Sequence, residues 1–255
     1  MRCKFIHAVY RTAVLERFAA AARAGFEAVE FLFPYEYAAG KSDSACRRTS
    51  CSWCCSIPHP ATSTPENGAR RHPRRSAEAR RDIELALEYA CQLGCPQVHI
   101  MAGVVPPGAD RAACEAVLID NLRYAAECFA RHDKRILIGA ESADQTGLSL
   151  PQSISDAGDG ETGRQAELAV QLDLFHAQKV DGNLSHLITE YAGQYRHIQI
   201  ASLPDRHEPD EGEINYPWLY ALLDKTGYDG WIGCEYIPRT DTLSGLGWFS
   251  PYRKK

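Results

Sequence analysis

Three polar side chains stand at the ends of short apolar runs in the second half of the chain. They are Asp173 in VQLDLF, Gln199 in HIQIAS and Glu235 in GCEYIP. Two carboxylates and an amide oxygen are hard ligands, of the kind that Mg²⁺ and Mn²⁺ prefer. Taken singly, an acidic residue at a strand end is more often a helix cap or a salt-bridge partner. Because three follow one another on successive runs, we predict a divalent-metal site, with Glu141 in ILIGAES as the fourth ligand.

Basic and imidazole side chains near the same runs are candidates for binding a substrate. His176 lies three residues after Asp173, where it would either orient a substrate oxygen or serve as a hydrogen-bonded core histidine. Arg206 and His207 begin the charged run RHEPDEGE, which is by default a solvated loop but at this end of a barrel would meet an anionic substrate. His99, inside VHIMAG, is interpreted as structural.

The elements that must position these groups alternate between strand-like runs and segments of helical periodicity. The predicted strands cover residues 28–33, 98–103, 135–141, 168–175, 197–202 and 231–236, and the predicted helices cover residues 13–25, 79–94, 109–132 and 216–227. Repeated units of this kind imply a parallel sheet with helices outside it. Six strands, with spacing for two more, predict a single-domain (β/α)8 TIM barrel over residues 1–255. In that fold the carboxyl ends of the strands meet at one face.

Length and charge agree with a barrel enzyme acting on a small molecule. The chain has 255 residues and a net charge of -5, and its pI is near 6.0. A concentrated basic surface is needed to bind nucleic acid or an anionic membrane, so we expect neither partner. Charged residues interrupt the first 25 positions, which predicts no signal peptide or membrane span. We therefore expect a cytoplasmic protein whose ten cysteines are free thiols, and leave a homo-oligomer open.

Residues 41–80 break the alternation of strands and helices. Ile57 is their only member of the Val, Ile, Leu, Met and Phe set, while serine, proline and arginine crowd the segment. We predict that no strand or amphipathic helix forms there. A structureless loop of this length inside a compact domain counts against the assignment or against the sequence itself.

A cluster of cysteines and histidines in the same segment raises the alternative of a zinc site. Thiolates and imidazoles bind zinc, and the cluster comprises Cys51, Cys54, Cys55, His59 and His72. The cysteines lack a second ligand pair at the spacing of a zinc finger, so this alternative ranks lower.

Four motifs carry a resemblance to a known family. They are GFEAVEFLFPYEY (25–37), HIQIA (197–201), RHEP with GEINYP (within 206–217) and GYDGWIGCEYIPR (227–239). Together they resemble the hydroxypyruvate isomerase family, which includes the 2-oxo-tetronate isomerases. The resemblance covers most of residues 13–40 and 79–138 and nearly all of residues 168–252.

The resemblance implies a TIM-barrel isomerase that binds a divalent metal, Mg²⁺ or Mn²⁺, and needs no organic cofactor. It places Asp173, Gln199 and Glu235 on the family's ligand positions. Glu235 and a glutamate near position 139, with Glu141 as this chain's candidate, would form the acid–base pair. The implied reaction interconverts hydroxypyruvate and 2-hydroxy-3-oxopropanoate (tartronate semialdehyde) through an enediol, a step of glyoxylate and carbohydrate metabolism.

Alternatives to hydroxypyruvate isomerisation stay open. One is the isomerisation of a longer 2-oxo-tetronate, and another is an inactive remnant of the family. A metal-dependent endonuclease on the same barrel is disfavoured by the acidic net charge and by the lack of extra histidine ligands.

The segment from residue 51 to 70, CSWCCSIPHPATSTPENGAR, stands where the family has its third strand and a glycine-rich loop. Read from the third base of each codon, Trp53–Cys54 must encode valine and Cys54–Cys55 must encode leucine. The same frame permits the family's loop, GDFDAGERG, in the residues that follow. A second frame permits a family-like first strand from residues 3–14, and residues 139 to about 165 also depart from the family. We interpret segments 3–14, 41–80 and about 139–165 as frame-shifted relative to the family.

Peptide mass mapping of the purified protein across residues 41–80 tests the frameshift hypothesis. If the frameshifts are errors of DNA sequencing and are absent from the gene, peptides of the GDFDAGERG type will be recovered. The family's activity will then apply in full. Recovery of peptides containing SCSWCCSIPHP would contradict that origin. A chain made in that form is expected to fold weakly or to lack the activity, because its first and third strands and their loops are replaced.

Overall fold

A computed structural model of the chain describes residues 4–7, 14–31, 35, 37–39, 52–55, 75–103, 105, 108–139 and 168–253, the short segments 4–7, 14–15 and 52–55 by their backbone alone. The chain divides into two compact units. The first comprises residues 1–30, 41–54 and 172–255, and the second comprises residues 31–40 and 55–171. The predicted single domain over residues 1–255 stays a prediction.

The first unit contains a parallel sheet that carries most of the predicted site. Its strands lie in the order β3 (Ser52–Cys55), β2 (Ala28–Glu30), β1 (Lys4–His7), β8 (Trp231–Cys234) and β7 (Tyr195–Ile200). The registers place Gly233 of β8 between Ile6 on one side and Gln199 on the other. Parallel pairing brings the carboxyl ends of these strands to one edge.

Helices of the first unit cover this sheet from outside. They are α1 (Val14–Ala24), α7 (Leu174–Val180), α8 (Leu184–Glu190), α9 (Tyr216–Thr226) and the 3₁₀ helix η4 (Ser244–Tyr252). Helices α8 and α9 pack against each other, and Trp218 of α9 donates a hydrogen bond from Nε1 to Ser185 Oγ of α8 at 3.1 Å. Phe26 stacks on Phe249 with ring centroids 4.3 Å apart, which fixes η4 against the approach to β2.

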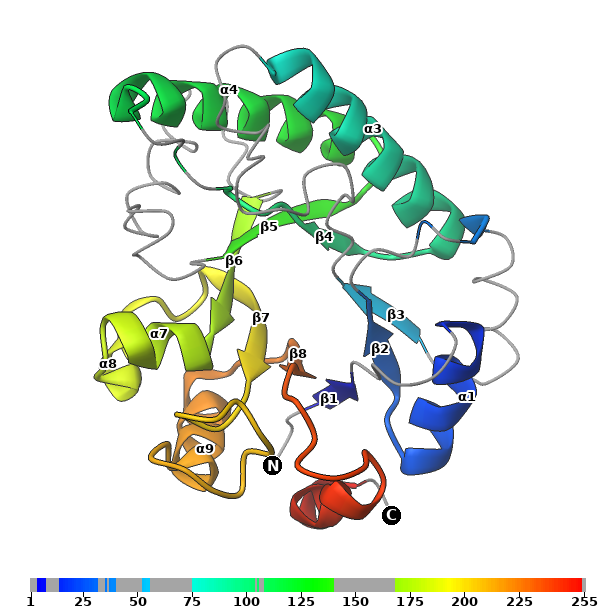
Figure 1. Ribbon diagram of the computed structural model, residues 1–255, viewed down its shortest axis with the longest axis vertical. Helices are drawn as coiled ribbons and strands as arrows, with labels where there is room; N and C mark the ends of the chain where they lie inside the picture. The colour runs from blue at the N-terminus through cyan, green and yellow to red at the C-terminus, as the bar shows by residue number, and fades with distance from the viewer. Residues whose placement is uncertain are drawn as a thin grey trace. The chain divides into compact units, whose positions relative to one another are not determined.

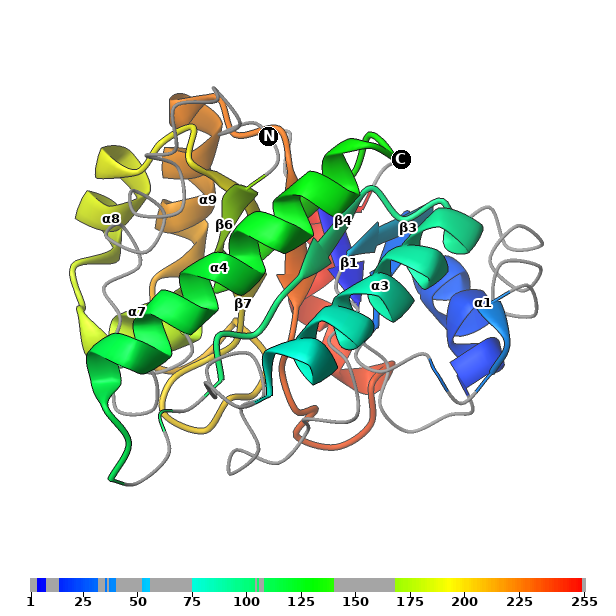
Figure 2. The same cartoon turned by 90° about the horizontal axis from the view of Figure 1, so that it is seen from above.

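The second unit is a layer of two long helices over three parallel strands. Helices α3 (Ser76–Leu93) and α4 (Arg111–Ala130) lie side by side over β4 (Gln97–His99) and β5 (Arg135–Gly139), as Figures 1 and 2 show. The third strand is β6 (Leu168–Asp173), whose last two residues belong to the first unit. Apolar residues at helical spacing form the buried face of α4, including Leu118, Leu122 and Phe129.

The predicted strands and helices are present, with shifted ends. The predicted strand 168–175 stops at Asp173, because the Asp173 side chain accepts hydrogen bonds from the next backbone amides and starts α7. The prediction that residues 41–80 form no strand or helix is wrong. Strand β3 lies at Ser52–Cys55 and α3 begins at Ser76. The hydrogen bonds of a sheet join backbone groups and do not depend on side-chain type. A segment that lacks an apolar pattern can therefore pair with a neighbouring strand.

Within the described ranges, no helix combines the length and the apolar character needed to cross a membrane.

Candidate active site

The three predicted ligands at strand ends all belong to the first unit. Asp173 ends β6, Gln199 lies near the end of β7, and Glu235 follows β8 directly. The Glu235 amide donates to the Ile200 carbonyl at 3.2 Å, continuing the pairing of β7 with β8. Asp173 and Gln199 are buried, and the Glu235 side chain is 18% exposed. The fourth predicted ligand, Glu141, lies outside the described residues.

Asp173 combines a structural role with a position at the site. Its Oδ1 accepts hydrogen bonds from the amides of Phe175 at 2.8 Å and His176 at 3.3 Å, so it is the N-cap of α7. Its Oδ2 lies 3.6 Å from Nε2 of His176. One carboxylate oxygen therefore holds the helix, while the other is directed towards the histidine.

His176 is a partly buried imidazole whose surroundings favour its neutral form. Burial lowers the pKa of His176, the Asp173 carboxylate raises it, and the cations Arg206 and Lys179 lower it, with a net shift downwards. The side chain is 22% exposed, and its Nδ1 has no hydrogen-bond partner among the described residues. A neutral ring of this kind offers both a donor and an acceptor.

Arg206 lies against Glu235 and is fixed by contacts on several sides. Its Nη2 is 3.2 Å from Glu235 Oε1, and its guanidinium lies over the Phe175 ring, 5.1 Å from the centroid. The backbone of Arg206 has a φ of 58°, donates to Ser202 at 2.9 Å and accepts from Ile237 at 2.7 Å. The loop after β7 is thereby joined to the segment after β8, and a guanidinium is placed beside a carboxylate.

His207 also links the loop after β7 to the segment after β8. Its Nδ1 lies 2.8 Å from the Ile237 carbonyl, and its amide donates to Ser202 Oγ at 2.9 Å. Contact between His207 and a substrate stays a prediction, and only Nε2 of the ring remains to make it.

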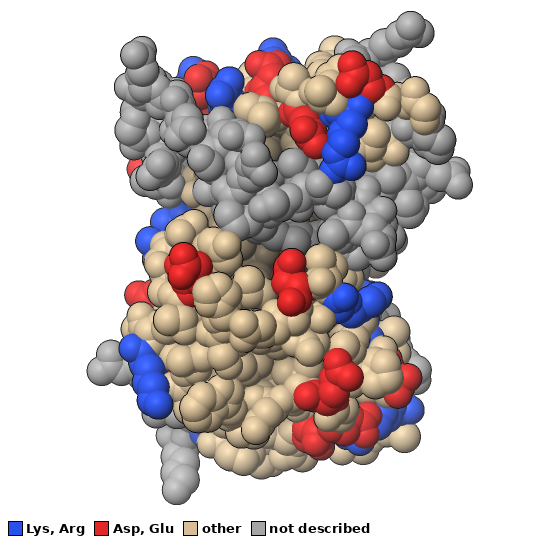
Figure 3. All heavy atoms as spheres, turned by 90° about the vertical axis from the view of Figure 1, so that its left-hand side faces the viewer, with Lys and Arg blue, Asp and Glu red and all other residues tan. Residues whose placement is uncertain are grey.

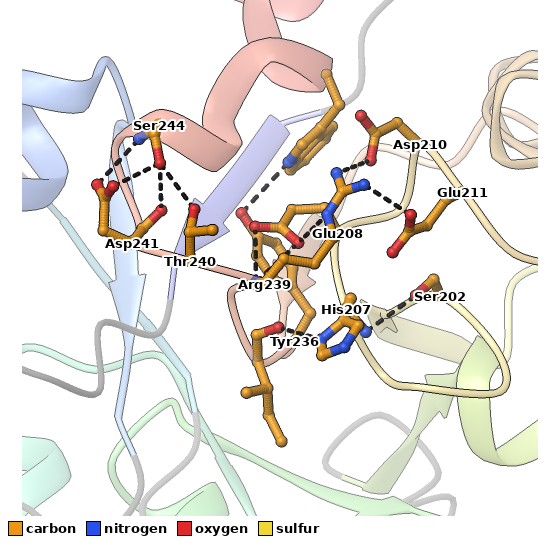
Figure 4. A network of polar contacts seen from close by, with 12 residues as sticks. Ser202, His207, Glu208, Asp210, Glu211, Tyr236, Arg239, Thr240, Asp241 and Ser244 are labelled. Carbon is orange, nitrogen blue, oxygen red and sulfur yellow. Dashed lines mark hydrogen bonds and ion pairs between the residues drawn. The ribbon is translucent and has the colours of Figure 1, made fainter.

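A carboxylate-rich cluster around Arg239, shown in Figure 4, was not foreseen in the sequence. Glu208 is fully buried and accepts hydrogen bonds from the amide and the Nε of Arg239, at 3.2 and 3.0 Å. The two other guanidinium nitrogens pair with Asp210 at 2.8 Å and Glu211 at 2.6 Å. We call the pair of Glu208, which is buried, and Arg239, whose side chain is 39% exposed, the Glu208–Arg239 clasp. A side chain at Gly245 would collide with the Glu208 carboxylate. The RHEP and YIPR motifs thus hold the two loops together.

Tyr216 of the GEINYP motif braces the end of β7. Its hydroxyl donates to the Ala201 carbonyl at 2.7 Å and accepts from the Ala201 amide at 3.2 Å. Burial raises the pKa of Tyr216, and the Asp173 carboxylate raises it further, so the phenol stays protonated. Its effect is to fix the strand end that follows Gln199.

A buried carboxylate also lies behind Gln199. Glu30 of β2 contacts His197 through Oε2, 2.7 Å from the ring Nε2, and accepts from Gln199 Nε2 through Oε1 at 3.3 Å. An acidic residue inside the apolar run AVEFLF was the one sequence signal that could have revealed this cluster.

Position 139, at the end of β5 in the second unit, is occupied by glycine. The Gly139 amide donates to His99 Nε2 at 3.1 Å, and Gln171 Nε2 lies 3.3 Å from His99 Nδ1. These contacts agree with a structural role for His99. A Cβ at 139 would lie 2.8 Å from His99 Nε2. The glutamate that the frameshift hypothesis places there would therefore require the imidazole to move.

The strand order, the strand-end carboxylates and the Arg206 guanidinium beside them are typical of TIM barrels, which gather polar chemistry at the carboxyl edge of the sheet. Comparison with known families agrees. The profile of the xylose isomerase-like TIM barrel matches residues 18–252, and this chain belongs to that family.

Curated relatives of the chain are named isomerases. The chain is 49% identical over 252 residues to a 2-oxo-tetronate isomerase of Pectobacterium atrosepticum, covering 94% of this chain and 93% of the relative. It is 34% identical over 247 residues to the hydroxypyruvate isomerase of Escherichia coli, with the same shares covered. The predicted resemblance to the hydroxypyruvate isomerase family and the predicted isomerase class are confirmed.

Solved structures confirm the barrel. A structure described as an AP endonuclease, family 2, from Brucella melitensis has a TM-score of 0.90 and 38% identity, with both chains fully covered. A D-psicose 3-epimerase at 14% identity has a TM-score of 0.75, covering 96% of this chain and 89% of that one, and supports the fold alone.

The Glu208–Arg239 clasp predicts a specific pattern of stability. Arg239→Met leaves the Glu208 carboxylate buried without its guanidinium, so we expect the melting temperature to fall by roughly 5–10 °C. Adding Glu208→Gln should recover part of the loss, because the buried charge is then removed. Glu211→Gln, which alters a partly exposed partner of the same guanidinium, is the control and should change the melting temperature little. Equal effects of Arg239→Met and Glu211→Gln would contradict this account.

The surroundings of His176 predict its titration. Followed by ¹H–¹⁵N NMR, the imidazole should titrate below its ordinary value of 6.5, because burial opposes its charged form. Asp173→Asn keeps a good N-cap but removes the anion, so it should lower the pKa of His176 further. Arg206→Gln removes a cation and should raise that pKa. Shifts in the opposite directions would show that these neighbours do not control the ring.

Proposed function

We propose that this protein isomerises a short 2-oxo hydroxy acid by moving a proton between adjacent carbons. The observation that carries the proposal is the Arg206–Glu235 pair, whose Nη2 and Oε1 are 3.2 Å apart at the strand edge that also bears Asp173 and Gln199. A cation that can bind a substrate carboxylate there stands beside a carboxylate that can accept a proton. The names of the curated relatives support the same reaction class.

The donor atoms at this edge fit a divalent cation, Mg²⁺ or Mn²⁺, in type. Asp173, Gln199 and Glu235 supply two carboxylates and a carboxamide, all hard oxygen donors. No group of three or more His, Cys, Asp or Glu side chains in the described ranges is placed to hold a metal. Asp173 and Glu235 are only two residues of those four types, and Gln199 contributes an amide oxygen. We infer that a further ligand comes from outside the described residues, with Glu141 as the candidate. When bound, the cation would polarise two neighbouring substrate oxygens.

The side chains at the edge divide the proton transfer between them. Arg206 binds the substrate carboxylate, a role suited to its planar guanidinium. Glu235 takes the proton from one carbon, and its acid–base partner, for which Glu141 is the candidate, returns a proton to the other carbon. His176, kept neutral by burial, can hydrogen-bond a substrate oxygen on which charge develops. No organic cofactor is needed, since the reaction is internally balanced.

Substrate length distinguishes two members of this reaction class. Hydroxypyruvate has three carbons and 2-oxo-tetronate has four. Relatives from Pectobacterium atrosepticum, Haemophilus influenzae and Cupriavidus necator, at 49%, 45% and 42% identity, are named 2-oxo-tetronate isomerases. The hydroxypyruvate isomerase of Escherichia coli is 34% identical. We therefore propose the four-carbon acid as the substrate to be tested beside hydroxypyruvate.

The described residues on the face drawn in Figure 3 give no support for nucleic acid as the substrate. On the face in Figure 3, Lys and Arg of the described residues are scattered among Asp and Glu and form no continuous basic patch. The net charge of the chain is -5. A phosphate backbone binds to concentrated positive charge, so a small anion fits better. A cytoplasmic location and a homo-oligomer stay predictions.

Steady-state kinetics with each acid, in the presence of Mg²⁺ or Mn²⁺, test the function. Glu235→Gln keeps the size of the side chain but removes the base, so we expect kcat to fall by about 10²- to 10⁴-fold. Glu213→Gln changes an exposed glutamate of the loop after β7 and should leave kcat unchanged.

A wild-type protein that turns over neither acid would count against the proposal. An abasic DNA duplex should be included in the same experiment. Its metal-dependent cleavage would favour the endonuclease alternative instead.

A further inference from the structure

Glu30 is a carboxylate enclosed in the sheet of the first unit. Its exposed fraction is 2%, and that of its partner His197 is 0%. Glu30 Oε2 and His197 Nε2 are 2.7 Å apart. Removing two ionisable groups from water is costly, and apolar residues of similar volume often stabilise a fold as well or better. A pair buried this deeply therefore calls for an explanation other than stability.

Gln199 is the group that the buried pair can act upon. His197 and Gln199 are two residues apart on β7 and so lie on the same face of the strand. Glu30 Oε1 accepts a hydrogen bond from Gln199 Nε2 at 3.3 Å. A carboxylate accepts only, so it selects the nitrogen of the carboxamide and turns the amide oxygen the other way. Without this acceptor, the amide could rotate by half a turn and present its nitrogen instead.

The packing around Glu30 leaves its carboxylate little freedom. The register places Gly233 of β8 beside Gln199, and a Cβ on Gly233 would collide with the Glu30 carboxylate. The glycine of the GWIGCEY motif thus provides the space that the carboxylate fills. His197 holds the second oxygen, while its own Nδ1 has no hydrogen-bond partner in the described part of the chain. His197 is therefore oriented by Glu30 alone among the described side chains.

We propose that Glu30, anchored by His197, is a positioning residue that fixes the Gln199 carboxamide with its oxygen directed to the metal and substrate. Glu30 itself contacts neither and acts through Gln199. The inference rests on the proposed function, because it requires Gln199 to be a ligand. It adds a residue of β2 to the described ligands Asp173, Gln199 and Glu235, which lie on or directly after β6, β7 and β8.

A double-mutant cycle tests this role with the full-length protein and Mn²⁺ alone as the probe. Glu30→Met keeps the volume but removes the acceptor, and Gln199→Ala removes the group that it positions. We expect Glu30→Met to weaken Mn²⁺ binding, measured by electron paramagnetic resonance, by about 10- to 100-fold. In the Gln199→Ala background the same change should have no further effect. Glu30→Gln retains an acceptor oxygen and should restore most of the affinity.

Tyr195→Phe is the matched control for a purely structural change. It removes a buried hydrogen bond on the same strand, from the Tyr195 hydroxyl to the Ile188 carbonyl at 2.9 Å, without touching Gln199. It should lower the melting temperature and leave Mn²⁺ affinity unchanged. Equal losses of affinity from Glu30→Met in both backgrounds, or no loss in either, would overturn the positioning role.

The outcomes separate this inference from the proposed function. If Gln199→Ala weakens Mn²⁺ binding and Glu30→Met does not, only the inference fails. If the wild-type protein does not bind Mn²⁺, or Gln199→Ala binds it as well as wild type, the proposed metal site fails and the inference fails with it.

If Glu30→Met does not fold, the positioning role can be tested by NMR measurement of hydrogen exchange in the wild-type protein. A Gln199 side-chain amide proton bonded to Glu30 should be protected from exchange with solvent. Free exchange of both amide protons would overturn the inference.

Discussion

Parallel pairing of β7 with β8 in a single register is the constraint on which the candidate site depends. That register places Gln199 beside Gly233, and the pairing continues from the Ile200 carbonyl to the Glu235 amide at 3.2 Å. Side chains alternate along a strand, so a slip of one residue would turn His197 and Gln199 to the opposite face together. The site residues on β7 and the residue after β8 are therefore fixed by backbone hydrogen bonds before any side chain contributes.

Two buried carboxylates then restrict the side chains and loops that the strands bring together. Glu30 lies beneath Gln199, and Glu208 joins the loop after β7 to the segment after β8. Each is fully or almost fully enclosed, each has a cationic or imidazole partner, and each occupies space left by a glycine, Gly233 or Gly245. An unpaired charge in such surroundings would be costly, so each carboxylate tightly restricts its neighbours. Glu30 thus restricts the Gln199 side chain, and Glu208 restricts the loop that carries Arg206.

Periodicity predicted most elements because burial imposes it. The apolar spacing of α3 and α4, and the apolar runs of β4 to β8, follow from faces that pack against one another. It failed at Ser52–Cys55, a strand without an apolar pattern, and at Leu174, where the Asp173 cap ends the strand earlier than the apolar run suggests. In both places hydrogen bonds determined where the strand formed or ended. Hydrophobicity averaged over a window of residues does not reveal such bonds.

The sequence by itself determined the barrel class, the family, and the placement of Asp173, Gln199 and Glu235 at strand ends, because those properties depend on residue type and spacing along one chain. Tertiary structure decided the contacts between distant segments: Arg206 with Glu235, Arg239 with Glu208, and Glu30 with His197 and Gln199. The Glu30 contacts join residues 167 and 169 positions apart. Only folding of the sheet brings such positions within hydrogen-bond distance, so spacing along the chain carries no trace of them.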